Sequence, residues 1–172
     1  MLFHVFMLGL LLKVWLNDIV YMVMKMEKIL TFIVNEYNEI LLLKGSENDS
    51  QFKKSFWYVV TGGCEKRDLN KEETVKREVK EETGLITNNN IYLNWILEYE
   101  SLGTQCREYV YISFVNKESI ILNEESIDYK WCEFEDFIQQ ITWFGDKEIL
   151  EKVLGLAIKK HLFFKEEKTD KF

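Results

Sequence analysis

Three glutamates near the end of one charged segment have the residue type and spacing that a metal site needs. Glu78, Glu81 and Glu82 stand at positions i, i+3 and i+4, so a helix would place them on one face. Glu78 and Glu82 would then repel each other by about 0.2–0.5 kcal/mol, near the negative end of the helix dipole. Stability alone does not favour this arrangement. A solvated acidic face is one interpretation, and a site for a hard cation such as Mg²⁺ or Mn²⁺ is the other.

The residues around these glutamates predict where the helix begins and ends. Asn70 is a good N-cap residue, and Glu73 stands three positions later, as in a capping box. Glu73 is also four positions before Arg77, a favourable spacing for an ion pair. Gly84 is a natural residue just after a helix. We therefore expect a helix from about Asn70 to Thr83.

Two glycines, Gly62 and Gly63, precede this helix where a strand passes into a loop, and they let backbone approach a ligand closely. Gly63 and residues 77–85 match the pattern G-x5-E-x7-R-E-U-x-E-E-x-G-U, in which U is aliphatic. This pattern is the Nudix box, so the chain resembles the Nudix hydrolase superfamily. The departure is Leu69, where the pattern has Glu, and the neighbouring Asp68 is a candidate substitute.

The resemblance implies an enzyme that hydrolyses phosphoanhydride bonds with Mg²⁺ (or Mn²⁺) as its cofactor. The catalytic residues that it implies are Arg77, Glu78, Glu81 and Glu82. The metal ligands that it implies are the carbonyl of Gly63 and the carboxylates of Glu78, Glu81, Glu82 and Glu125. Arg77 would orient Glu78, and either Glu81 or Glu125 would act as the general base.

The resemblance extends over about residues 28–156 and narrows the substrate. Residues 56–63 resemble the segment before the box in dihydroneopterin triphosphate pyrophosphatases, and residues 125–131 resemble a segment shared with dinucleoside tetraphosphate hydrolases. The proline-lysine-glycine sequence that precedes the box in many of the latter is missing. This favours a nucleoside triphosphate or dihydroneopterin triphosphate. The alternatives are a dinucleoside polyphosphate hydrolase and a non-hydrolysing Nudix module that senses a nucleotide. The side chains that could stack on a base or pterin ring, or simply belong to the core, are Trp57, Tyr58 and Trp143.

The remaining sequence predicts an α/β (α+β) domain. Apolar runs bounded by turn residues predict strands at residues 29–34, 40–44, 56–60, 91–98, 107–115 and 129–133. An amphipathic pattern predicts a closing helix at residues 147–161. The resemblance implies the Nudix fold, an α/β/α sandwich with a mixed β-sheet and the box as strand, loop, helix and loop.

The composition limits the partners that the domain can have. The chain has 172 residues, with 29 acidic and 22 basic side chains and a formal net charge of −7. This acidity argues against a nucleic-acid polymer as partner and favours a small nucleoside diphosphate derivative bound through a metal. Three cysteines without a CxxC spacing are typical of reduced thiols, so we expect a cytoplasmic protein. The resemblance also makes a homodimer possible.

The ends of the chain differ in composition from its middle. Residues 1–25 form an apolar segment that is either an accessory part of the protein or sequence upstream of a later translation start. A membrane role is disfavoured because Lys13, Asn17 and Asp18 interrupt the apolar run. Residues 26–163 are expected to form the Nudix domain, and residues 164–172 a charged tail.

Overall fold

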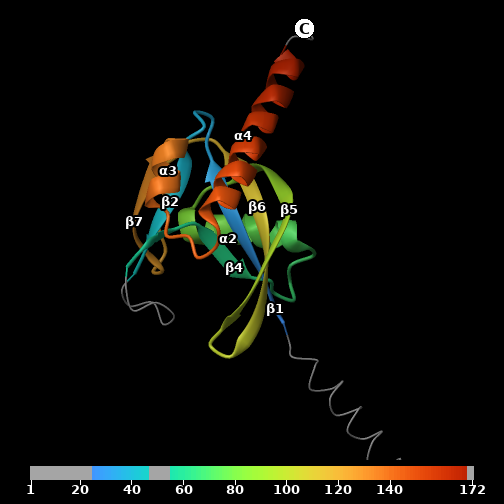
Figure 1. Ribbon diagram of the computed structural model, residues 1–172, viewed down its shortest axis with the longest axis vertical. Coiled ribbons are helices and arrows are strands. Elements are labelled where there is room, and N and C mark those ends of the chain that lie inside the picture. The colour runs from blue at the N-terminus through green and yellow to red at the C-terminus, as the bar shows by residue number, and fades with distance from the viewer. Residues whose placement is uncertain (1–24, 47–54, 170–172) are drawn as a thin grey trace, which may run out of the picture.

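A computed structural model describes residues 25–46 and 55–169 of the chain, with side chains as far as residue 160 (Figure 1). The strands are β1 (Met26–Val34), β2 (Ile40–Gly45), β3 (Trp57–Tyr58), β4 (Val60–Gly63), β5 (Thr87–Ser101), β6 (Thr104–Val115) and β7 (Ser126–Cys132). The helices are α2 (Lys71–Thr83), α3 (Phe134–Gln140) and α4 (Lys147–Thr169). The expected apolar segment at residues 1–25 lies almost entirely outside the described residues. Within them, no helix is long and apolar enough to cross a membrane.

The seven strands form one mixed sheet with β1 near its centre. β1 runs parallel to β6, from Met26 opposite Cys106 to Val34 opposite Phe114, and antiparallel to both β2 and β4. The order β3-β2-β1-β6-β5 is completed by β7, which pairs with β2. β1 can hold this place because its last six residues, from Ile29 to Val34, are all buried and only Thr31 among them is polar, as a strand covered on both faces requires.

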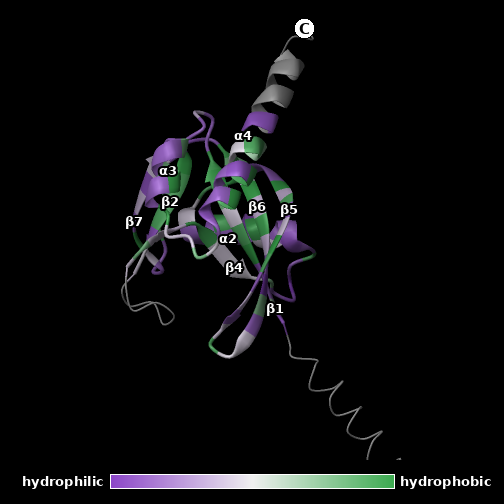
Figure 2. Cartoon of the chain, in the orientation of Figure 1, coloured by the Kyte–Doolittle hydropathy of each residue, from purple (hydrophilic) through white to green (hydrophobic). Residues whose placement is uncertain are grey.

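Helices cover both faces of the sheet, which confirms the predicted sandwich (Figure 1). Alternate residues of β1 point to opposite faces, so Ile29 and Ile33 join one core cluster while Leu30 and Phe32 join the other. α2 covers the first face with Val75 and Val79, and α3 and α4 cover the second with Phe137, Leu150 and Leu154. Figure 2 shows the hydrophobic strands between helices that carry hydrophilic residues on their outer sides.

The predicted strand at residues 56–60 is in fact two strands. β3 pairs with β2, whereas β4 pairs with β1, so the chain changes partner at Val59. β4 also continues through Gly63, although we expected the strand to stop before Thr61. The apolar composition indicated extended backbone correctly, but it carries no information on which neighbour each residue pairs with.

Two helices also differ from the sequence prediction. The short helix α3 was missed because its seven residues show too little periodicity. α4 begins at the predicted residue, Lys147, but continues to Thr169, past the predicted end of the closing helix at residue 161.

Candidate active site

The helix α2 is held at both ends by the predicted capping residues. The side chain of Asn70 accepts a hydrogen bond from the backbone N–H of Glu73 at 3.0 Å, and Gly84 ends the helix with a φ of 74°. The carboxylate of Glu73 contacts Lys76 at 3.0 Å instead of the predicted partner Arg77. Arg77 is therefore left to turn toward the loop that precedes the helix.

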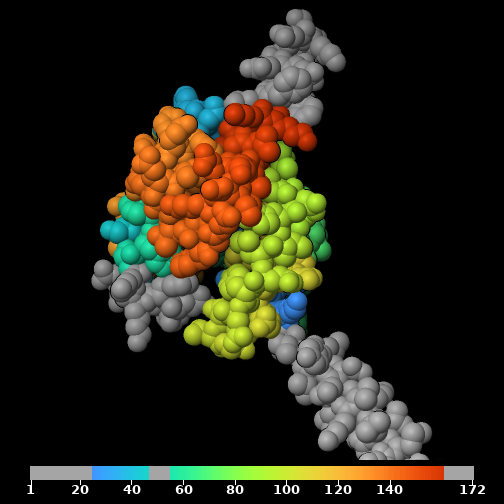
Figure 3. All heavy atoms as spheres, viewed as in Figure 1, coloured from blue at the N-terminus to red at the C-terminus, as the bar shows by residue number. Residues whose placement is uncertain are grey.

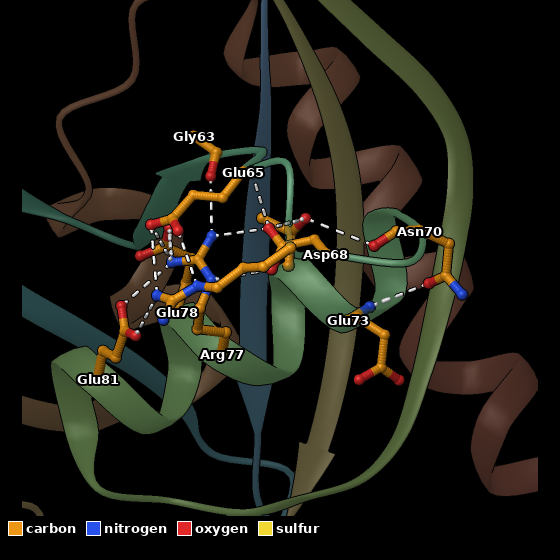
Figure 4. A network of polar contacts seen from close by, with 10 residues as sticks. Gly63, Glu65, Asp68, Asn70, Glu73, Arg77, Glu78 and Glu81 are labelled. Atoms are coloured by element: carbon orange, nitrogen blue, oxygen red, sulfur yellow. Dashed lines mark hydrogen bonds and ion pairs between the residues drawn. The ribbon is translucent and has the colours of Figure 1, made fainter.

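Arg77 is the centre of a polar network that joins the box loop to the box helix (Figure 4). Its Nη2 donates to the carbonyl of Gly63 at 2.9 Å, and its Nη1 donates to Glu78 at 2.7 Å and to Glu81 at 3.1 Å. Arg77 thus contacts Glu78 directly, as the predicted orienting role would require. The same bonds occupy the Gly63 carbonyl and hold two of the three helix glutamates.

Asp68 is the principal partner of Arg77. The guanidinium contacts both carboxylate oxygens, with Nε 3.1 Å from Oδ1 and Nη2 2.9 Å from Oδ2, and the Thr74 hydroxyl also donates to Oδ2. These donors hold the pKa of Asp68 well below its usual range, with the Arg77 hydrogen bonds as the largest cause. Leu69 is 90% exposed. Leu69, at the position where the pattern has Glu, supplies no carboxylate to Arg77, and the neighbouring Asp68 supplies one instead.

Replacing Asp68 with Asn is expected to lower the free energy of unfolding at pH 7 by about 2–3 kcal/mol, because the buried guanidinium loses its two-point ionic partner. The folded-state pKa lies below the unfolded value of about 3.9, so the stabilisation is complete above about pH 5 and is lost as the pH falls below about 4. Urea unfolding of both proteins should therefore show a smaller difference at pH 3 than at pH 7.

Leu69→Glu is the matched control for the Asp68 variant. Because the Leu69 side chain points into solvent and Asp68 already pairs with Arg77, restoring the pattern residue should change stability by less than about 0.5 kcal/mol. A neutral Asp68→Asn together with a stabilising Leu69→Glu would contradict the assignment of Asp68.

Gly62 allows the Glu78 carboxylate to lie against the strand β4. A Cβ atom at Gly62 would stand 1.9 Å from Cδ of Glu78, whereas a Cβ at Gly63 would meet nothing within 4 Å. Gly62 is therefore needed because any larger residue would collide with the Glu78 side chain. Gly63 contributes a carbonyl to the Arg77 network.

The three helix glutamates differ sharply in burial. The side chain of Glu81 is 49% exposed and that of Glu78 is 13% exposed, whereas Glu82 as a whole is only 6% exposed. Burial is the main reason why the pKa of Glu82 is raised well above its usual value, and the charges of Glu125 and Glu78 raise it further. The backbone N–H of Thr61 donates to this carboxylate, but its Oε1 is buried without a partner among the described groups.

This donor set fits a hard cation in its chemistry. Burial raises the pKa of both Glu78 and Glu82, and the charge of Glu125 raises both further. The buried Oε1 of Glu82, which has no partner among the described groups, is the kind of atom that requires one. In the described part of the chain, however, no three His, Cys, Asp or Glu side chains form a ready-made metal cluster. Glu78 and Glu81 are held by Arg77, so a cation would have to draw these side chains together.

A cavity of about 580 Å³ adjoins Glu82 and Glu125. Tyr58 and Trp143 line it and stack on each other, with ring centroids 6.2 Å apart and planes inclined by 29°. Figure 3 shows the exterior, where the connection between α3 and α4 (orange) lies beside the β5–β6 hairpin (yellow-green). Of the three aromatic residues that could stack on a ring or simply belong to the core, only Trp57 is absent from the cavity wall. It lies beneath the ammonium group of Lys130, 3.7 Å from its ring centroid.

Several polar side chains of the cavity wall were missed in the sequence analysis, among them those of Lys28, Tyr99 and Glu108. Glu108 could have been found, because it stands in the alternating segment of β6 on the same face as the core residues Val110 and Ile112. A charged residue in such a row is informative in itself, since buried charges require partners.

Comparison with known proteins places these features in a family. The NUDIX domain family profile matches residues 24–153, so the chain belongs to the Nudix hydrolase family, the enzymes that act on pyrophosphate bonds. Members of this family generally use divalent metals such as Mg²⁺. A search of curated proteins finds no significant match.

Solved structures show the same fold at low sequence identity. The MutT protein of Methanosarcina mazei is 22% identical with a TM-score of 0.62, over 80% of this chain and 95% of that one. The C. elegans Ap4A hydrolase is 20% identical with a TM-score of 0.64, over 78% and 98%. The E. coli dihydroneopterin triphosphate pyrophosphohydrolase is 20% identical with a TM-score of 0.57, over 73% and 92%. At these identities, the likeness extends to the fold alone.

Proposed function

We propose that this protein is a Mg²⁺-dependent pyrophosphohydrolase for a nucleoside (or pterin) diphosphate linked to a further group, with a nucleoside triphosphate or dihydroneopterin triphosphate as the substrate type. The observation that carries the proposal is the buried Oε1 of Glu82, which has no partner among the described groups and lies beside a cavity with aromatic rings in its wall. A cavity of about 580 Å³ has the size of a small-molecule site, which supports a nucleotide-sized substrate over a nucleic-acid polymer.

The residues of the site would have different roles in metal binding, positioning and proton transfer. Glu78, Glu82 and Glu125 would hold Mg²⁺, with Glu81 and the carbonyl of Gly63 as further ligands. Bound Mg²⁺ would neutralise the phosphates and activate a water molecule. Arg77 holds Glu78 in position from the side of the loop. The exposed Glu81 and Glu125 remain the two candidates for the general base.

The wall of the cavity contains both aromatic rings and carboxylates, which suits a substrate with a flat ring and a phosphate chain. Tyr58 and Trp143 would stack on the ring, and the carboxylates would face the phosphates through the cation. All three cysteines of the chain are free thiols, which supports the cytoplasm as its compartment.

A non-hydrolysing nucleotide-binding module is the second candidate function. The observation that favours it is the pair of bonds from Arg77 that occupy Glu78 and Glu81. If these bonds persist with substrate and Mg²⁺, the protein would bind a nucleotide without cleaving it.

A hydrolysis screen distinguishes the two functions. With Mg²⁺, we expect release of pyrophosphate or phosphate from nucleoside triphosphates or dihydroneopterin triphosphate, and no release in the presence of a chelator. Dinucleoside polyphosphates, ADP-ribose and sugar nucleotides complete the panel. If a dinucleoside polyphosphate is cleaved faster than the triphosphates, it becomes the assigned substrate. Binding of a compound without release of phosphate or pyrophosphate from any member of the panel would favour the sensing module.

A further inference from the structure

The cavity wall contains a buried carboxylate to which the proposed hydrolysis gives no role. Glu108 lies on β6 and is 3% exposed. Its Oε1 accepts a hydrogen bond from the Tyr99 hydroxyl at 3.2 Å and is 4.0 Å from Nζ of Lys28. Both of these contacts are made by one oxygen, and Oε2 takes part in neither.

Packing of the sheet does not explain why this position is acidic. Val110, Ile112 and Phe114 follow Glu108 at alternate positions of β6, and all three belong to the core cluster beneath α3 and α4. An apolar side chain would continue that row without the cost of burying a charge. Burial raises the pKa of Glu108, and Lys28 and Tyr99 oppose this shift only in part.

The cavity wall around Glu108 combines aromatic rings with polar atoms. Tyr58 and Trp143 line the same cavity; burial raises the pKa of the Tyr58 phenol, and the charge of Glu108 raises it further. The indole N–H of Trp143 is buried and has no hydrogen-bond partner among the described groups. The cavity therefore offers aromatic rings together with a carboxylate acceptor and an unused N–H donor.

An ionised carboxylate selects ligands by the donors that they present. It has only acceptors, so it pairs best with two neighbouring N–H groups on one ring edge. Guanine (2-amino-6-oxo) and pterins (2-amino-4-oxo) offer such a pair, with a ring N–H beside the exocyclic 2-amino group. Hypoxanthine lacks the amino group. Adenine places a bare ring nitrogen next to its amino group, and that lone pair would face the carboxylate.

We propose that Glu108 is a specificity-determining residue that accepts hydrogen bonds from the ring N–H and the 2-amino group of a guanine-type or pterin-type ring held in this cavity. The inference rests on the proposed function, because it assumes that the cavity receives the ring of the substrate. Tyr99 and Lys28 would act through Glu108 by fixing its Oε1 and leaving Oε2 for the ligand.

Nucleoside binding tests the inference without any need for turnover. Titrations of the full chain with guanosine, inosine, adenosine and neopterin, in the absence of metal, can be followed by calorimetry. We expect guanosine or neopterin to bind about 10- to 100-fold more tightly than inosine and adenosine. Whichever of guanosine and neopterin binds more tightly identifies the ring system that the cavity prefers. Equal affinity for guanosine, inosine and adenosine, with neopterin no tighter, would overturn the proposal.

Glu108→Gln should remove this preference while leaving adenosine binding unchanged, because Gln keeps the shape of the side chain but replaces one acceptor with a donor. Glu98→Gln is the matched control, since Glu98 also borders the cavity but is half exposed and pairs with Arg107 at 2.8 Å. A preference that survives in Glu108→Gln, or that is lost equally in Glu98→Gln, would contradict the assignment. If Glu108→Gln does not fold, the affinities of the unaltered protein for guanosine and inosine decide whether the proposal holds, because only guanosine has the 2-amino group.

The nucleoside titrations and the hydrolysis screen can fail separately. Selective binding of guanosine or neopterin with no turnover of any phosphate compound would defeat the proposed hydrolysis and leave the role of Glu108 intact. Equal turnover of GTP, ITP, ATP and dihydroneopterin triphosphate, unchanged in Glu108→Gln, would defeat the role of Glu108 and leave the hydrolysis intact.

Discussion

Glu82→Gln is expected to reduce Mg²⁺-dependent hydrolysis by about 1,000-fold while leaving the fold intact. The substitution keeps the size of the side chain but removes the charge from a buried carboxylate whose Oε1 has no partner in the described part of the chain. Burial opposes ionisation of Glu82, so a neutral side chain should fold at least as well without metal. We therefore expect the variant to melt at or above the temperature of the unaltered protein in a chelator.

Glu72→Gln provides the matched control for this experiment. Glu72 lies on the same helix, but it pairs with Lys76 at 3.2 Å on the exposed side. Its loss should change activity less than about twofold, since surface ion pairs contribute little. Melting curves with and without Mg²⁺ provide a second readout, because a bound cation stabilises the folded protein and Glu82→Gln should abolish that increase. Unchanged turnover in Glu82→Gln would remove this residue from the metal site.

Local chemistry in the sequence predicted the box helix well. Asn70 and Gly84 act through hydrogen bonds and backbone angles within a few residues, so their effects can be read from neighbours alone. The common face of the three helix glutamates follows in the same way. Their unequal burial does not, because it depends on β4 and on the cavity, which are placed by strand pairing.

Strand pairing and register determine the positions of those site residues that could not be placed from the sequence. Trp57 and Tyr58 are adjacent in one strand, so they point to different sides, but only the pairing of β3 with β2 settles which one meets the cavity. Glu108 lies opposite Lys28 of β1, about eighty positions away, and no local pattern brings these residues together. The pairing of Arg77 with Asp68 likewise depends on the course of the loop.

Gly62→Ala is expected to reduce hydrolysis by about 100-fold at a much smaller cost in stability. The added Cβ would stand 1.9 Å from Cδ and 2.1 Å from Oε1 of Glu78. These atoms are the end of a flexible side chain, so the carboxylate can swing away and spare the backbone. In doing so it leaves its bond to Arg77, and a displacement of about 1 Å at a catalytic group can cost about 100-fold in rate. The free energy of unfolding should fall by only about 1 kcal/mol.

Two further variants test whether the effect of Gly62→Ala passes through Glu78. Gly63→Ala should leave the free energy of unfolding nearly unchanged, because a Cβ there meets nothing within 4 Å. In a Glu78→Ala background, Gly62→Ala should cause little further loss of activity or stability, since the group that it displaces is already absent. Independent, additive losses in the double variant would show that Gly62 acts on the backbone of β4. Strong coupling would show that this glycine is needed to make room for the Glu78 carboxylate.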